Sequence, residues 1–197
     1  MDTDKHELQG QKTKLRAEMR GGLKYLSSEK RAADSTKIRG LLPRQPFWKT
    51  AATVLFFAPL PDEPDLWPLL EETLTAGKIV ALPRFDADNQ FYTPRRVSGL
   101  HAELVLGRFG IREPAAHCVA IPLDDLDLVL VPGIAFDPHG YRLGRGQGFY
   151  DRLLAGVRGI KCGMAFDEQM VQKMPAETFD VRMDFILTPT RLIKVPG

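Results

Sequence analysis

Apolar side chains recur at helical spacing near the start of the chain. Leu15, Met19, Leu23 and Leu26 lie three or four positions apart, with mostly polar and basic residues between them. This spacing is typical of an amphipathic helix. The stretch LSSEKR then carries serines that can cap a second helix. We expect that helix to run to about Leu42, where the prolines of PRQPFW end it.

Short, continuous apolar runs alternate with helical segments along the rest of the chain. The runs expected to form strands are TVLFFA (53–58), KIVALP (78–83), QFYTP (90–94), DLDLVLVPG (125–133), IKCGMAF (160–166) and DFILT (184–188). Pro94 cannot donate to a strand ladder, so QFYTP is expected at a sheet edge. Strands separated by helices indicate a mainly parallel sheet covered on both faces. We therefore predict one α/β domain over residues 1–197, with three α/β/α layers and a Rossmann-like open sheet.

Composition and charge narrow the class of partner. Lys and Arg number 27 against 25 Asp and Glu, so the net charge is +2 and no strong field favours nucleic acid or an anionic membrane. No apolar run approaches the ~20 residues of a membrane-spanning helix. Cys118 and Cys162 lack metal-ligand spacing. These features predict a cytoplasmic protein in a reducing compartment, a monomer or small homo-oligomer, whose partners are small molecules.

The segment HGYRLGRGQGFYDRLL (139–154) places four glycines and two arginines between a predicted strand and a helix expected to begin near Phe149. Glycine lets backbone N–H groups approach a ligand, the helix N-terminus adds partial positive charge, and arginine forms charge-assisted hydrogen bonds with phosphate oxygens. Ligands of open α/β sheets bind beyond the carboxyl ends of the strands. We therefore predict a phosphate site that includes Arg142, Gly144, Arg145, Gly146 and Gly148. A tight connection with solvated arginines is the competing interpretation.

Familiar nucleotide loops do not match this segment. The chain contains no Gly-Lys-Ser or Gly-Lys-Thr, which the Walker loop requires, and Phe149 stands where a dinucleotide fingerprint needs its third glycine. The longer stretch VPGIAFDPHGYRLGRGQGFYDRLL (131–154) instead resembles the signature of the 5-formyltetrahydrofolate cyclo-ligase family. Further pieces occur in the family's order: KTKLR, PLPDEPD, LPRF, GIREP, AFDEQMVQKMP and FDVRMDFILT. The resemblance covers almost the whole chain.

This resemblance implies a fold, a reaction and cofactors. The fold would be a NagB/RpiA/CoA transferase-like version of the predicted α/β domain. The reaction would use ATP and Mg²⁺ to convert 5-formyltetrahydrofolate to 5,10-methenyltetrahydrofolate, releasing ADP and phosphate. Phosphorylation of the formyl oxygen would make it a leaving group that N10 can displace. Such chemistry needs positioning and charge stabilisation more than a protein nucleophile.

The resemblance also implies a role for each residue that matches the family's motifs. Those implied to bind ATP are Lys12, Arg16, Arg142, Gly144, Arg145, Gly146, Gln147, Gly148, Phe149 and Tyr150. Those implied to bind the folate are Ala58, Glu63, Arg145 and Phe149. Arg145 and Tyr150 are implied to be catalytic, with Arg145 stabilising charge at the transferring phosphoryl group. Asp151 and Asp184 are implied to hold Mg²⁺.

Without the resemblance, several of these residues have ordinary interpretations. Lys12 and Arg16 would form a solvated basic helix face, Asp151 would be an acid in the first turn of a helix, and Asp184 a loop acid. Two positions depart from the family's pattern. Phe149 replaces the first tyrosine of Tyr-Tyr-Asp, and Gln147 stands where many members have lysine or glycine. The aromatic side chains Phe57, Phe85 and Trp67 could supply apolar surface for the pterin, but they are interpreted as core and left out of the predicted site.

Two other functions remain open from the sequence. The first is a phosphate- or nucleotide-binding metabolic enzyme on the same scaffold that does not turn over folate, since fold likeness alone does not exclude it. The second is a nucleic-acid-binding module that uses Arg95, Arg96, Arg142 and Arg145. That module would lack interleaved exposed aromatics and a strongly basic pI. Retention of Glu63, Asp151 and Asp184 beside the glycine-arginine loop favours the ligase.

Overall fold

The computed structural model describes residues 2–100, 102–108, 110–177 and 180–196. Within these residues, a seven-stranded sheet has the order β11-β10-β9-β6-β1-β2-β3. Its strands are β1 (Thr53–Leu55), β2 (Ile79–Asp86), β3 (Phe91–Val97), β6 (Leu128–Val131), β9 (Ile160–Met164), β10 (Phe185–Leu187) and β11 (Leu192–Lys194). The strands from β10 to β2 run parallel, and the edge strands β3 and β11 are antiparallel to their neighbours. The predicted mainly parallel sheet is confirmed.

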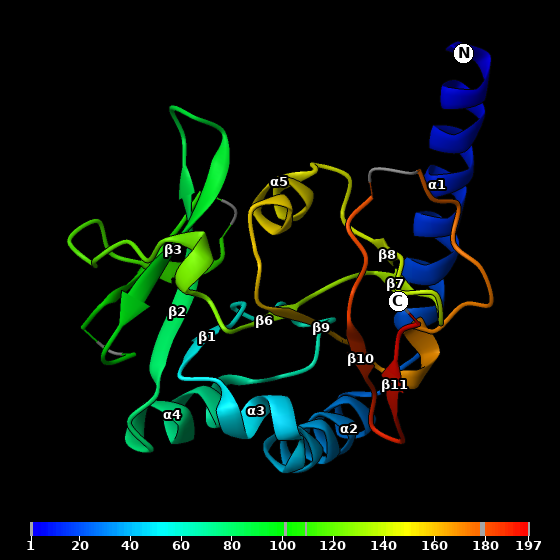
Figure 1. Cartoon of the computed structure of the whole chain (residues 1–197). Coiled ribbons are helices and arrows are strands. Elements are labelled where there is room, and N and C mark those ends of the chain that lie inside the picture. The colour runs from blue at the N-terminus through cyan, green and yellow to red at the C-terminus, as the bar shows by residue number, and fades with distance from the viewer. Residues whose placement is uncertain (1, 101, 109, 178–179, 197) are drawn as a thin grey trace.

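Helices cover both faces of this sheet. They are α1 (Asp2–Leu23), α2 (Ser28–Leu41), α3 (Pro46–Thr50), α4 (Trp67–Thr75) and α5 (Phe149–Ala155), with 3-10 turns at Leu42–Arg44, Leu123–Asp125 and Asp167–Gln169. Figure 1 shows α2, α3 and α4 beneath the sheet and α5 above it. Val54 packs in the apolar cluster that includes α2, α3 and α4, whereas the next residue, Leu55, packs in the cluster with α5. This alternation is the strand periodicity of two, and it confirms the three layers.

Local sequence signals explain where several elements begin. Ser27 caps α2 by accepting a hydrogen bond from the Lys30 backbone N–H at 3.1 Å, as the LSSEKR pattern predicted. The prediction that PRQPFW only ends this helix was incomplete, because Pro46 begins α3. Proline suits the first helical position, where its missing N–H has no partner to lose, and Phe47 and Trp48 bury the short helix in the core.

The segment before β6 forms a hairpin that sequence analysis did not identify. Strands β4 (Leu104–Leu106) and β5 (Arg112–Pro114) pair antiparallel. The hairpin is held to β2 by two hydrogen bonds: Arg84 Nη1 donates to the Pro114 carbonyl at 2.5 Å, and the Phe85 N–H donates to Glu113 Oε2 at 3.2 Å. Across the described ranges, no helix is long and apolar enough to cross a membrane.

Candidate active site

A cavity of about 250 Å³ opens at the carboxyl edge of the sheet. Phe57 and Ala58, just beyond β1, and Pro132 and Gly133, just beyond β6, form its floor. The other walls come from β3, the β4–β5 hairpin and the glycine-arginine loop before α5. The position agrees with the rule that ligands bind beyond the carboxyl ends of parallel strands. The predicted loop and the strand ends therefore meet around one space.

Arg142 lies on the short strand β8 (Arg142–Leu143), which pairs with β7 (Ala135–Phe136). Its side chain is only 4 % exposed and forms an ion pair with Asp151 of α5. A Cβ at Gly144 would lie 2.9 Å from Arg142 Nη1, so glycine at this position leaves room for the guanidinium. The loop thus holds a buried cation and its carboxylate partner at the cavity wall.

Arg145 reaches across the cavity to the segment that follows β1. Its Nη2 lies 2.6 Å from Asp62 Oδ1 and 3.0 Å from Glu63 Oε1. The second oxygen of Glu63, Oε2, accepts the Leu60 N–H at 3.0 Å. Burial raises the pKa of the Glu63 carboxyl, although Leu60 and Arg145 act against that shift. Arg145 and Glu63, both predicted for the site, are brought together as an ion pair.

Two glycines of the loop adopt backbone conformations that other residues rarely accept. Gly146 has φ of 104° and Gly148 has φ of 65°, both in the positive region. Gly148 is also the residue that precedes the first turn of α5. These angles turn the chain so that Gln147, Phe149 and Tyr150 all line the cavity.

Tyr92, Phe149 and Tyr150 form an aromatic wall of the cavity. The ring centroid of Tyr92, on β3, lies 5.5 Å from that of Phe149 and 6.0 Å from that of Tyr150. The Arg142 guanidinium lies 5.7 Å from the Tyr150 ring centroid. Burial raises the pKa of the Tyr150 hydroxyl well above its usual value, and burial also raises the pKa of Tyr92 to about 12. Both hydroxyls therefore stay protonated and can donate hydrogen bonds at neutral pH.

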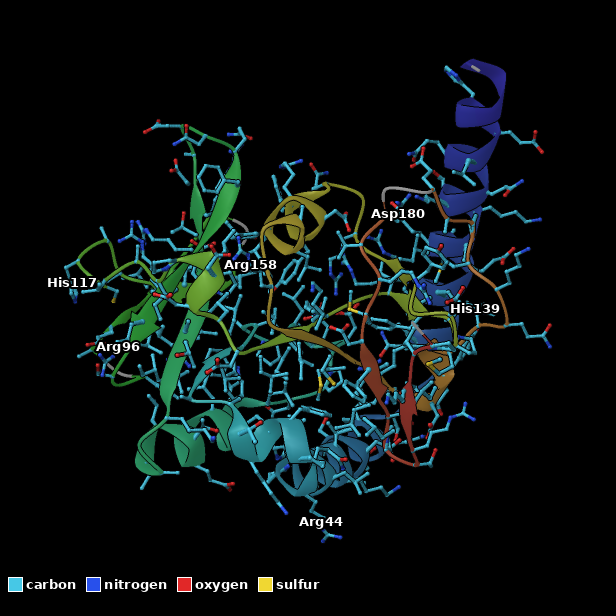
Figure 2. The ribbon with its side chains drawn as sticks, viewed as in Figure 1. Arg44, Arg96, His117, His139, Arg158 and Asp180 are labelled. Atoms are coloured by element: carbon cyan, nitrogen blue, oxygen red, sulfur yellow. The ribbon has the colours of Figure 1, made fainter. Side chains whose placement is uncertain are left out.

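The two basic residues of α1 have different positions. Arg16 Nε donates to the Gly144 carbonyl at 3.0 Å, so this guanidinium contacts the predicted phosphate loop. Lys12 Nζ instead lies 2.8 Å from Asp180 Oδ2 and 3.3 Å from Glu177 Oε2. Figure 2 shows Asp180 beside α1. Lys12 is not among the described residues that line the cavity, so the structure does not bring it to the loop as predicted.

The two predicted magnesium ligands lie at opposite edges of the sheet. Asp151 lines the cavity, whereas Asp184 precedes β10 at the amino edge, where its Oδ2 accepts the Lys161 N–H at 2.7 Å. The predicted pair of metal-binding acids is therefore not formed. Of the residues with described positions, no three His, Cys, Asp or Glu side chains form a metal-binding group. A cavity-bound metal ion would take Asp151 from the protein and its other ligands from phosphate and water.

Phe57, Tyr92 and Glu113 are among the cavity residues for which the sequence predicted no role in the site. Phe57 was interpreted as core, but it lines the cavity from the end of β1, and Tyr92 does so from the edge strand β3. Glu113 belongs to GIREP, a piece of the family resemblance to which no role was attached. Its side chain lines the cavity, and the residue is 4 % exposed. The acidic residue within GIREP was the sequence feature that could have indicated a role in the site.

Comparison with known proteins identifies the family. Residues 8–189 match the model of the 5-formyltetrahydrofolate cyclo-ligase family. The chain belongs to this family. The Escherichia coli K12 5-formyltetrahydrofolate cyclo-ligase is 38 % identical over 149 residues, which cover 72 % of this chain and 80 % of that protein. The cyclo-ligase of Mycolicibacterium smegmatis is 32 % identical over 185 residues, which cover 91 % of this chain and 94 % of that one.

A solved structure of a related protein has the same fold. The NMR structure of Aquifex aeolicus 5,10-methenyltetrahydrofolate synthetase superimposes with a TM-score of 0.85 at 34 % sequence identity. The match covers 94 % of this chain and 93 % of the other. The fold predicted from the alternation of strands and helices is therefore that of a cyclo-ligase relative.

The departures from the cyclo-ligase signature have a structural context. Phe149 lacks the hydroxyl of tyrosine, but its ring packs against Phe85, with centroids 5.0 Å apart, and against Tyr92. Gln147 lines the cavity, and its backbone carbonyl accepts a hydrogen bond from Arg152 Nη1 at 3.4 Å. Packing of the Phe149 ring thus does not depend on a hydroxyl at that position.

Proposed function

We propose that this chain catalyses the ATP-dependent cyclisation of 5-formyltetrahydrofolate to 5,10-methenyltetrahydrofolate, with release of ADP and phosphate. Membership of the cyclo-ligase family is the main support. The cavity adds a physical argument, because it combines two arginines and Asp151 with an aromatic wall. The arginines suit a triphosphate, the carboxylate suits the metal ion that accompanies it, and aromatic rings suit a flat pterin.

The reaction proceeds in two steps in this proposal. The formyl oxygen attacks the γ-phosphoryl group of ATP, and ADP leaves. N10 then attacks the activated formyl carbon and loses its proton, and the C–O bond breaks so that phosphate leaves with the original formyl oxygen. The protein's part is to hold the two substrates in line and to stabilise the charge that develops on the phosphoryl oxygens.

Arg145 is proposed as the residue that stabilises the transferring phosphoryl group. Its side chain is 36 % exposed, so its guanidinium can exchange the Asp62 carboxylate for phosphate oxygens. Tyr150 is proposed as a second hydrogen-bond donor, because its hydroxyl is protonated and the residue lines the same cavity. The ion pair with Glu63 links this end of the cavity to the folate side.

The remaining loop and helix residues are proposed to bind the substrates. Arg16, Arg142, Gly144, Gly146, Gln147 and Gly148 would contact ATP, and Ala58, Glu63 and Phe149 would contact the folate. Lys12 can join the ATP site only by releasing Glu177 and Asp180. Its proposed role therefore requires a local exchange of ion pairs.

Magnesium is proposed as the cofactor that accompanies ATP. Asp151 would contribute a carboxylate, and Mg²⁺ commonly takes one or two carboxylates and fills its other positions with water and phosphate oxygens. When bound, the ion would neutralise charge on the triphosphate. The ion pair between Arg142 and Asp151 keeps this carboxylate at the cavity wall.

A cytoplasmic location and a monomer or small homo-oligomer remain part of the proposal. The two cysteines, Cys118 and Cys162, are free and buried, and this fits a reducing compartment. Neither is placed in the proposed chemistry.

A spectroscopic assay for the methenyl product tests the proposed function. We expect product only when ATP, Mg²⁺ and 5-formyltetrahydrofolate are all present, with ADP released in equal amount. ATP hydrolysis that ignores the folate would instead favour the phosphate-binding enzyme without folate turnover. The family match gives that alternative no support.

A further inference from the structure

Two buried glutamates line the cavity, and their hydrogen bonding differs. Both oxygens of Glu63 have protein partners: Oε1 pairs with Arg145 and Oε2 accepts the Leu60 N–H. Glu113 Oε2 accepts the Phe85 N–H at 3.2 Å. Glu113 Oε1 is buried, and no residue that the structure describes donates a hydrogen bond to it. Among the described residues, Glu113 therefore brings to the cavity lining a carboxylate with an unused acceptor oxygen.

An unpartnered buried carboxylate oxygen is costly. Leaving a buried polar atom without a partner costs roughly 1–3 kcal/mol, and more for a charged group. Native structures seldom keep such atoms unless water, an ion or a ligand satisfies them. Burial also raises the pKa of the Glu113 carboxyl, which reports the same lack of solvation. A ligand with an N–H donor at this position would remove the penalty.

The position of Glu113 is fixed by its surroundings. A Cβ at Gly107, in the turn of the same hairpin, would lie 2.3 Å from the Glu113 carboxyl carbon. Any residue larger than glycine at position 107 would thus displace the carboxylate. The Phe85 N–H also fixes the carboxylate, because it donates a hydrogen bond to Glu113 Oε2. Nearby Arg84 donates to the Pro114 carbonyl, so its guanidinium holds the hairpin rather than the carboxylate oxygen.

We propose that Glu113 is a specificity residue that accepts a hydrogen bond from an N–H group of the pterin ring of the folate substrate. This inference rests on the proposed function and adds a recognition contact to it. The pterin carries a cyclic guanidine with adjacent N–H donors, which suits a carboxylate acceptor. A phosphate group has no such donor, and its negative charge opposes an approach to Glu113. The triphosphate is therefore expected beside Arg142 and Arg145, which also line the cavity.

The Glu113→Gln variant tests the contact most sharply. Because the Phe85 N–H needs an acceptor, the single amide oxygen of the new side chain is expected to take that bond. Its NH₂ group would then face the N–H donors of the ligand. We expect the Kd for 5-formyltetrahydrofolate, measured by calorimetry without ATP, to rise about tenfold or more, as for loss of a charge-assisted hydrogen bond. The Kd for ATP with Mg²⁺ should stay within about twofold of the wild-type value.

Two further variants separate recognition from folding. Gly107→Ala keeps the Glu113 charge but displaces it, so it should also weaken folate binding and leave ATP binding unchanged. Glu103→Gln is the matched control, because Glu103 directly precedes β4 and accepts the Ser98 N–H but is not among the described residues that line the cavity. It should bind both ligands normally. If Glu113→Gln does not fold, the folate affinity of Gly107→Ala tests the role of Glu113.

The outcomes distinguish this inference from the proposed function. If Glu113→Gln and Gly107→Ala bind 5-formyltetrahydrofolate as well as the wild-type protein does, the role of Glu113 alone is overturned. Loss of ATP affinity instead of folate affinity would also overturn it. A tetrahydropterin without the p-aminobenzoylglutamate portion should show the same loss on Glu113→Gln. Failure of the wild-type protein to bind or convert the folate would overturn the proposed function itself.

Discussion

The two edges of the sheet use acidic residues in different ways. At the amino edge, Asp127 Oδ2 accepts the N–H groups of Ala52 and Thr53 at 2.8 and 2.9 Å, and Asp184 accepts the Lys161 N–H. At the carboxyl edge, Asp151 and Glu63 pair with arginine side chains around the cavity. An acid just before a parallel strand thus satisfies backbone donors, whereas an acid beyond a strand end meets cations and a ligand space. Position along the strand separates structural acids from candidate functional ones.

The largest expected effect is at the carboxyl edge, on Arg145. Arg145→Ala should lower kcat by about 10²-fold or more, because a preorganised donor to the transferring phosphoryl group is removed. Stopped-flow or steady-state measurement of methenyl formation checks this. Arg158→Ala is the control, since Arg158 is 83 % exposed and pairs with Asp124 outside the cavity. Near-normal turnover of Arg145→Ala would remove this residue from the catalytic step.

A smaller effect is expected when Asp151 loses its charge. Asp151→Asn should raise the Mg²⁺ concentration for half-maximal activity roughly tenfold, because a charge-assisted contact of about 1.5–3 kcal/mol is lost. A magnesium titration at saturating ATP and folate measures it. An unchanged titration curve would mean that Asp151 serves only the ion pair with Arg142.

Lys12 should show a weaker effect on the nucleotide and an additional effect on stability. Lys12→Ala should raise the Kd for ATP about fivefold, as expected for a partly exposed ion contact of about 1 kcal/mol. It should also lower the free energy of unfolding by about 1–3 kcal/mol, because Glu177 and Asp180 lose their partner. Calorimetry and denaturant unfolding measure the two effects.

Lys14→Ala is the matched control for Lys12, because the Lys14 side chain is 81 % exposed and pairs only weakly with Glu18 at 3.9 Å. A loss of stability in Lys12→Ala with unchanged ATP affinity would make Lys12 a purely structural residue of α1.

The smallest effect is expected at the amino edge. Asp184→Asn keeps an oxygen for the Lys161 N–H, so the free energy of unfolding should fall by no more than about 1 kcal/mol. Turnover should stay within about twofold of wild type, and the magnesium titration should not move. A shift in that titration like the one expected for Asp151→Asn would contradict the division between the two edges.

Much of the fold follows from local patterns in the sequence. Buried parallel strands give continuous apolar runs, so β1, β2, β6, β9 and β10 were all predicted, and Pro94 correctly indicated an edge strand. The β4–β5 hairpin was missed because no residue of β4 is buried and β5 contains two charged residues, so neither strand gives a continuous apolar run. The strand β11 was missed because it lies at the sheet edge and none of its three residues is buried, unlike the equally short strands β1 and β10.

The site residues were predictable where they belong to one continuous motif. They were less predictable where tertiary contacts determine the position of the side chain. The glycine-arginine loop folds as one unit, so its residues converge on the cavity. The family resemblance placed Asp184 and Asp151 in one metal site. The sheet separates them, because Asp184 precedes β10 at the amino edge and Asp151 lies at the carboxyl edge. The partners of Lys12 lie 165 or more residues away in the sequence, and the hydrogen-bond partner of Glu113 lies 28 residues away. The periodicity of apolar residues does not reveal such long-range contacts.

A structure of the protein crystallised with a non-hydrolysable ATP analogue, Mg²⁺ and 5-formyltetrahydrofolate tests the central claim most directly. We predict that the γ-phosphate lies within hydrogen-bonding distance of the Arg145 guanidinium, with the pterin ring in the same cavity against Phe57 and Tyr92. A triphosphate bound outside this cavity, with Arg145 still paired to Asp62 and Glu63, would contradict the account.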